Sequence, residues 1–172
     1  SLVMKPTFII KTKSEWMRLS KGVINIPYPT RQEMWELSKP YPTAKQIMFL
    51  WLDNNRYKAM VKLMFFNKKQ SKECGSISKL PLCELGDVII HENYRGKWLC
   101  KKIVKPVVSY FNRFFKKTHF LFLTVNNDKI PALKCYAHLF KDVGDSPRKL
   151  KDFFKKRYPW MNVEIHKLFI LK

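Results

Sequence analysis

Apolar and polar residues alternate along the chain in a pattern that predicts strands and helices from end to end. Residues 46–66 give the clearest signal, because Asp53, Asn54 and Asn55 separate two apolar runs and are typical of a β-hairpin turn. The second run has the two-residue period of a strand. It places Tyr57, Ala59, Val61, Leu63 and Phe65 on one face, and Lys58 and Lys62 on the other.

Helical periods appear in other segments. Residues 30–39 begin with a capping box, in which Thr30 caps the first turn and Glu33 reaches back, and Pro40 ends the helix. Residues 97–117 predict a longer helix that Pro106 should kink. Its apolar stripe consists of Ile103, Val104, Val107, Val108, Phe111, Phe114 and Phe115, and its basic stripe of Lys101, Lys105, Arg113 and Lys117.

The remaining segments complete the expected order. Strands are predicted over 3–12, 82–91, 119–125 and 161–172, and helices over 14–21, 130–140 and 146–158. Residues 67–80 are basic and are expected to form a flexible loop. The order β-α-α-β-β-β-α-β-α-α-β predicts one domain over residues 1–172, of the α/β (α+β) class, with a mixed sheet and helices on both faces.

The charge balance changes the list of expected partners. Lys and Arg number 34 against 13 Asp and Glu, which gives a formal net charge of +21. Such a chain attracts polyanions, so nucleic acid is the first partner to consider and an anionic membrane surface the second. A lysine-prone genome would produce the same composition without any such partner. Aromatic residues among the basic ones in 148–160 also suit a surface on which bases stack.

The cysteines do not form a recognisable metal-binding pattern. Cys74, Cys83, Cys100 and Cys135 contain no CxxC pair and no histidine at zinc-finger spacing, so no metal is expected. No signal peptide and no apolar run of membrane-spanning length is evident. We therefore expect reduced thiols in a cytoplasmic, reducing compartment.

The run "HENYRGKWLCKKI" (91–103) stands between a predicted strand and a predicted helix. A helix N-terminus offers unpaired N–H groups and the positive end of a dipole to a phosphate. Small residues there let the backbone approach the phosphate oxygens. Arg95 and Lys97 add charge, whereas Trp98 occupies a position where a small residue is expected.

The element order and this run resemble the GNAT superfamily of acyl-CoA N-acetyltransferases, whose signature Arg/Gln-x-x-Gly-x-Gly/Ala follows the fourth strand. The resemblance implies a mixed, mostly antiparallel central sheet and acetyl-CoA as cofactor. Trp98 and Cys100 depart from the small residues of the signature. Trp98 packed under the helix would leave the cofactor site open, whereas Trp98 between the strands would block it. The implied cofactor-binding residues are Ile89, Ile90, Arg95, Gly96, Lys97, Trp98, Leu99 and Cys100.

Two further residues are assigned roles by the same resemblance. Tyr136 follows Ala132 in a pattern typical of the helix after the fifth strand, and it would protonate the departing thiolate. Glu84, at the start of the fourth strand, would take a proton from the acceptor amine; Asp87, His91 and Glu92 are rivals. Without the resemblance, Tyr136 is equally a half-buried aromatic and Glu84 a partner of a lysine.

Three functions fit the sequence. The first is acetyl transfer from acetyl-CoA to an amine on, or associated with, nucleic acid, because of the net charge. The second is DNA base modification by an enzyme resembling the phage Mom class. The third is a non-catalytic GNAT-like module that binds DNA or RNA, with Lys101, Lys105, Arg113 and Lys117 as its nucleic-acid-binding face.

Overall fold

The computed structural model describes residues 3–37, 45–96 and 98–172. Its strands are β1 (Phe8–Ile10), β2 (Lys45–Asp53), β3 (Arg56–Phe65), β4 (Leu82–Ile90), β5 (Phe120–Asn126), β6 (Phe140–Asp145) and β7 (His166–Leu171). Its helices are α1 (Lys13–Leu19), α2 (Arg31–Trp35), α3 (Lys68–Glu73), α4 (Leu99–Phe114), α5 (Ile130–Tyr136) and α6 (Arg148–Arg157). Three short 3₁₀ turns are η1 (Ser20–Gly22), η2 (Glu92–Tyr94) and η3 (Val163–Ile165).

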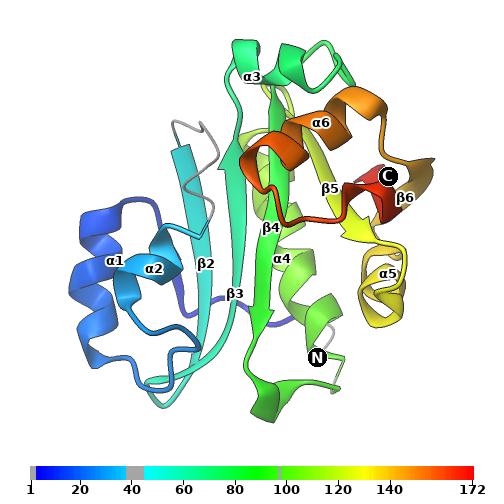
Figure 1. The fold of residues 1–172 in the computed structure, drawn as a ribbon. Helices are drawn as coiled ribbons and strands as arrows, with labels where there is room; N and C mark the ends of the chain where they lie inside the picture. Colours follow the sequence, from blue (N-terminus) through cyan, green and yellow to red (C-terminus); the bar gives the residue numbers. More distant parts are fainter. Residues whose placement is uncertain (1–2, 38–44, 97) are drawn as a thin grey trace.

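The strands form one seven-stranded sheet in the order β1-β2-β3-β4-β5-β7-β6 (Figure 1). Neighbours are antiparallel except β4 and β5, which run parallel. This arrangement confirms the predicted class, a mixed and mostly antiparallel sheet. None of the helices in the described ranges combines the length and apolarity needed to cross a bilayer.

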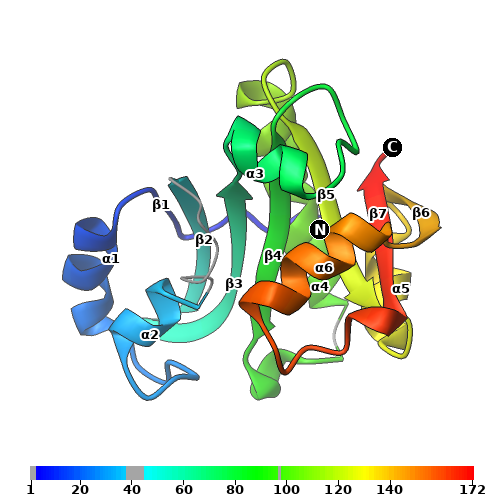
Figure 2. The same cartoon turned by 45° about the horizontal axis from the view of Figure 1, so that its top comes forward.

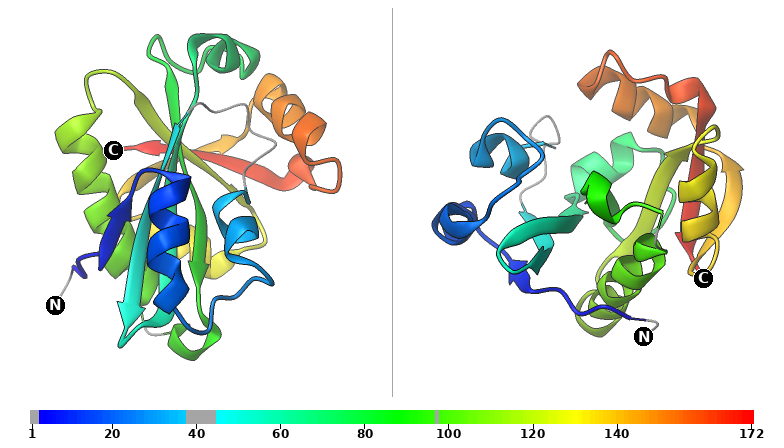
Figure 3. Two further views of the ribbon diagram at one scale, coloured as in Figure 1. Left: turned by 90° about the vertical axis from the view of Figure 1, so that its left-hand side faces the viewer. Right: turned by 90° about the horizontal axis from the view of Figure 1, so that it is seen from below.

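Helices cover both faces of the sheet (Figures 2 and 3). One face packs against α4 and α5, whose buried side chains include Val107, Phe111 and Tyr136. On the other face, α1 and α2 pack against the β1–β3 side with Trp16 and Met34. The helices α3 and α6 cover the β4–β5–β7 side of that same face.

Several elements are shorter than the sequence predicts: β1 covers only Phe8–Ile10, α4 ends at Phe114 and β7 starts at His166. Two segments differ in kind. The flexible loop expected over 67–80 is wrong for residues 68–73, which form α3 through a capping box between Asn67 and Gln70. The helix expected over 130–140 ends at Tyr136, and Phe140 begins the additional strand β6. The predicted stop at Pro40 lies outside the described residues.

The side chains of β3 lie on the faces that the sequence predicts, except near the start of the strand. Ala59 packs toward α4, as expected, but Tyr57 packs on the opposite face with α1 and α2. The cause is a bulge: Trp51 pairs with Ala59 and Leu52 with Tyr57, so Lys58 is an extra residue that reverses the alternation.

Lys62 on β3 is fully buried and joins three elements. Its ammonium group donates to the carbonyls of Met34 and Trp35 at the end of α2, at 2.9 Å each. It also lies 3.3 Å from an oxygen of Asp87 on β4. Burial lowers the pKa of Lys62, and the carboxylate of Asp87 opposes that change. Lys62 therefore fixes the position of α2 over the sheet.

We expect Lys62→Met to lower the free energy of unfolding by about 3 kcal/mol, because removing one partner of a buried ion pair leaves the other poorly solvated. Urea denaturation followed by circular dichroism measures the change. Lys105→Met on the exposed face of α4 is the control and should alter stability by less than about 0.5 kcal/mol. Equal stabilities of the two variants would contradict the role of Lys62.

Candidate active site

The site begins where β4 and β5 separate. The two strands pair over three positions, from Leu82 with Phe120 to Glu84 with Phe122, and in the described residues they pair no further. Just beyond, β4 carries a bulge opposite β3, and Asp87 in the bulge has a φ of 46°. This left-handed conformation is unfavourable for a non-glycine residue and is typical of functional sites. Each face of the gap contains one cavity.

The larger cavity, of about 850 Å³, lies between the end of β4, the first turn of α4 and α5. All the predicted cofactor-binding residues that the structure describes line it, and Lys97 lies outside the described residues. Those residues are Ile89, Ile90, Arg95, Gly96, Trp98, Leu99 and Cys100. The sequence run around Gly96 thus forms one wall of a real cavity, and α5 forms the facing wall.

Trp98 occupies neither of the two positions expected for it. Its side chain is 71% exposed, so it is not packed beneath α4 and does not fill the gap between the strands. It stands at the rim of the cavity, with the ammonium of Lys101 4.7 Å from its ring centroid. Its φ is 59° and that of Gly96 is 77°. Trp98 therefore adopts a backbone conformation that glycine would adopt at less cost.

A disulfide joins the two walls of this cavity. Cys100 in the first turn of α4 and Cys135 in α5 are bonded, with their Cα atoms 6.0 Å apart. The prediction of four reduced thiols is therefore wrong for this pair, whose closeness arises from the packing of α4 on α5. Cys74 and Cys83 are free and buried, as expected of inert thiols.

The smaller cavity, of about 400 Å³, opens on the other face of the gap. It contains Glu84 and Asp87 of β4, together with aromatic side chains from α6 and the segment after it. The two cavities share the residues Val88 and Tyr136. These two residues are therefore the place where the cavities come closest to each other, and we call this place the junction.

Tyr136 is suited to donate a proton at the junction. Its side chain is 92% buried, and burial raises its pKa to about 12. The hydroxyl therefore remains protonated across the neutral pH range. Its ring packs against that of Phe140 in a T-shaped arrangement, with the two centroids 6.4 Å apart.

The structure separates the rival proton acceptors. Glu84 and Asp87 line the smaller cavity, whereas His91 and Glu92 line neither cavity. The structure adds His166, which also lines the smaller cavity and which the sequence did not single out. The sequence alone held no signal for it, because its place depends on the pairing of β7 with β5.

The comparisons with known proteins agree with this geometry. A model of the acetyltransferase (GNAT) family matches residues 14–140, and the chain belongs to this family. No curated protein matches the chain significantly in sequence. The confirmed resemblance is distant, as the departures at Trp98 and Cys100 suggest.

Solved structures share the fold at low identity. Arabidopsis thaliana NAA60 bound to a bisubstrate analogue is 15% identical with a TM-score of 0.53, over 95% of this chain and 98% of that one. Escherichia coli ElaA is 11% identical with a TM-score of 0.55, over 96% and 99%. A chimera of the Vibrio cholerae spermidine N-acetyltransferase SpeG and hSSAT is 15% identical with a TM-score of 0.54, over 95% and 96%.

Acetyl-CoA is the usual cosubstrate of the family, and the larger cavity fits it. The first turn of the 16-residue helix α4 lines the cavity and has no side-chain cap, and a helix N-terminus favours a pyrophosphate. A methyl group added at Gly96 would meet nothing within 4 Å, so the loop leaves space beside its backbone. Arg95 and Lys101 supply positive charge at the same rim.

We expect Trp98→Gly to leave the dissociation constant for CoA unchanged or to lower it, because glycine accepts the positive φ and lets a phosphate approach the backbone. Isothermal titration calorimetry with CoA tests this. Trp160→Gly is the control, since Trp160 is similarly exposed but lines the other cavity. A tenfold loss of affinity in Trp98→Gly alone would show that the indole itself holds the cofactor.

Proposed function

We propose that this protein is an acetyl-CoA-dependent N-acetyltransferase with its acceptor amine in the smaller cavity. The observation that carries the proposal is the junction of the two cavities at Val88 and Tyr136. Acetyl-CoA supplies the acetyl group as a thioester. The junction is the place where an amine from one side reaches a thioester carbonyl from the other.

Different groups near the junction are proposed to carry out different parts of the reaction. The backbone of β4 near Ile90 is proposed to polarise the thioester carbonyl. Tyr136 gives its proton to the departing sulfur, which its raised pKa permits at neutral pH. The amine must lose a proton before it attacks, and the smaller cavity offers Glu84, Asp87 and His166 for that purpose.

The charge of the smaller cavity favours a cationic acceptor. The chain has 13 acidic residues against 34 basic ones, and two of the acidic residues line this one cavity. Their carboxylates attract an ammonium group, while Tyr158 and Trp160 offer aromatic faces to its alkyl chain or charge. A protonated alkylamine is the simplest such acceptor, and a neighbour of this fold is described as a spermidine N-acetyltransferase.

A second candidate function is binding of nucleic acid at the outer face of α4. Lys105 and Arg113 of α4 are exposed there, Lys117 is exposed in the turn after α4, and Lys101 lines the larger cavity. The whole chain has a net charge of +21. A basic face on such a chain suits a polyanion that carries or accompanies the acceptor amine. The exposed basic residues and the net charge are the observations that support a nucleic-acid acceptor, which remains a proposal.

We expect Tyr136→Phe to lower kcat by 10²–10⁴-fold, the usual contribution of a general acid, with the affinity for CoA nearly unchanged. Release of CoA thiol measures turnover, and calorimetry measures affinity. Tyr110→Phe is the matched control. Tyr110 of α4 is partly buried against the hydrophobic core, and it lines neither cavity. Absence of CoA binding to the wild type at millimolar concentration would refute the proposed function as a whole.

For the basic face, each phosphate neutralised on duplex DNA should add about 0.9 to the slope of log affinity against log salt. The double variant Lys105→Glu with Arg113→Glu should therefore reduce the slope by about 2, as measured by fluorescence anisotropy with a DNA duplex. Lys68→Glu with Lys69→Glu, exposed on α3, makes the same charge change elsewhere. Equal slopes for both double variants would rule out this face.

A further inference from the structure

The disulfide between Cys100 and Cys135 joins two walls of the larger cavity that little else connects. Cys100 lies in the first turn of α4 and Cys135 lies in α5, and both residues line the cavity. Across the described residues, no hydrogen bond or ion pair links α4 to α5. Apart from the disulfide, the two helices are held by apolar side chains of one hydrophobic core, among them Leu99 and Tyr136. The separation of these walls therefore depends on a bond that a thiol can break.

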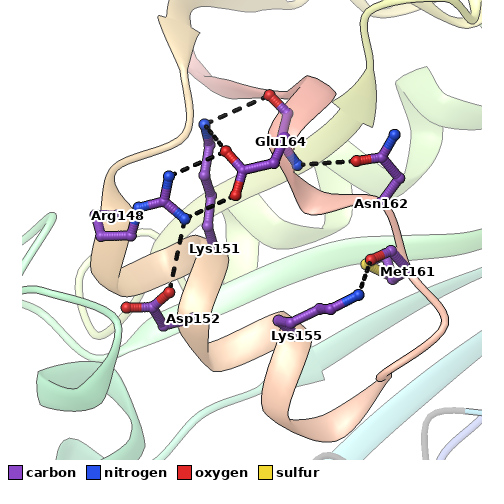
Figure 4. A network of polar contacts seen from close by, with 7 residues as sticks. All are labelled: Arg148, Lys151, Asp152, Lys155, Met161, Asn162 and Glu164. Carbon is purple, nitrogen blue, oxygen red and sulfur yellow. Dashed lines mark hydrogen bonds and ion pairs between the residues drawn. The ribbon is translucent and has the colours of Figure 1, made fainter.

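The wall of the smaller cavity is held by bonds of another kind (Figure 4). The segment after α6, which contributes Trp160 and Met161 to that cavity, is fastened to the helix by charged hydrogen bonds. The guanidinium of Arg148 donates to both carboxylate oxygens of Glu164, at 2.8 and 3.0 Å. Lys155 donates to the carbonyl of Met161, at 3.1 Å. None of these bonds contains sulfur, so sensitivity to a reductant is expected at the larger cavity and not at the smaller one.

The position of Cys100 favours reduction of the disulfide. Cys100 is partly exposed, whereas Cys135 is only 5% exposed, so Cys100 is the more accessible of the two. Cys100 is also the second residue of the 16-residue helix α4, whose N-terminus has no side-chain cap. The positive end of a helix dipole stabilises a thiolate, and a disulfide whose reduced form is stabilised is more easily reduced. Arg95, Lys101 and Lys134 line the same cavity and no acidic side chain of the described residues does, which favours the thiolate further.

The helix α5 depends on this bond for its position. It has only seven residues and no side-chain cap, whereas α4 has sixteen residues. A helix as short as α5 is marginal unless tertiary contacts hold it. With the disulfide closed, α5 is held against the first turn of α4 before any ligand arrives. With the disulfide open, a ligand between the two helices must order this wall itself, and that cost lowers its affinity.

We infer that the disulfide between Cys100 and Cys135 is a redox switch that sets the affinity of the larger cavity for acetyl-CoA, and that the oxidised form binds more tightly. The inference rests on the proposed function, which places acetyl-CoA in this cavity. The reductant is a dithiol. One of its thiolates attacks Sγ of Cys100, and the electron pair of the S–S bond leaves with Sγ of Cys135, which takes a proton. The second thiol of the reductant then displaces Cys100 as a thiolate and closes the reductant's own disulfide, so that two electrons pass to the protein.

Isothermal titration calorimetry with desulfo-CoA, a probe that has no thiol of its own, tests the inference. Wild-type protein treated with oxidised dithiothreitol should bind the probe about tenfold more tightly than protein reduced with dithiothreitol, a coupling of the size usual for linked sites. Alkylation with iodoacetamide followed by mass spectrometry reports the state of both cysteines. Cys135→Ala leaves the first turn of α4 intact and should bind like the reduced form, with or without dithiothreitol. Cys74→Ala removes a free thiol instead, and this control should keep the difference.

Linkage gives a second readout that needs no variant. Saturating desulfo-CoA should raise the ratio of reduced to oxidised dithiothreitol at half-reduction by the same factor that calorimetry finds between the two affinities. Absence of binding to either form would refute the proposed function. Equal binding to both forms, or tighter binding to the reduced form, would overturn the switch alone. So would a disulfide that does not form, or one that dithiothreitol does not reduce in the native protein.

Discussion

The separation of β4 from β5 after Glu84 is the constraint on which the rest of the site depends. If the parallel pair continued, its ladder would close the gap and neither cavity could reach the other. The bulge at Asp87 turns β4 away at this point, and the ion pair between Asp87 and Lys62 ties that bulge to α2. The packing of α2 on one face of the sheet thus helps to hold the β4 bulge, and with it the gap between β4 and β5 that both cavities adjoin.

The two cavities differ in electrostatic character although one sheet separates them. The rim of the larger cavity carries Arg95 and Lys101, whereas the smaller one contains Glu84 and Asp87. This difference is what the proposed acetyl transfer would require, with a phosphate-bearing cosubstrate on one side and a protonated amine on the other. The exterior remains strongly basic, so the acidic cavity is a local exception to the field of the whole chain.

Local patterns predicted most of the fold. The turn at Asp53–Asn55 and the apolar stripe of α4 depend on neighbouring residues and were readable from the sequence. The helix α3 was missed because its lysines were interpreted as a solvated loop, although Asn67 and Gln70 held the signal of a cap. In the site, the run that lines the larger cavity before and into α4 could be singled out from the sequence, since it is contiguous. The disulfide and His166 were not, because each depends on contacts between segments that are distant in the chain.

The bond between Cys100 and Cys135 restricts how the larger cavity can open. It closes a covalent ring across 35 residues that includes α4, β5 and most of α5, so the first turn of α4 and α5 cannot move apart. Any widening of this cavity must then come from elements outside the ring, among them the segment just before α4, where Gly96 has a left-handed backbone conformation and Trp98 is exposed to solvent. The disulfide keeps the first turn of α4 and α5 at a fixed separation, whereas the segment before α4 has no covalent link across the cavity.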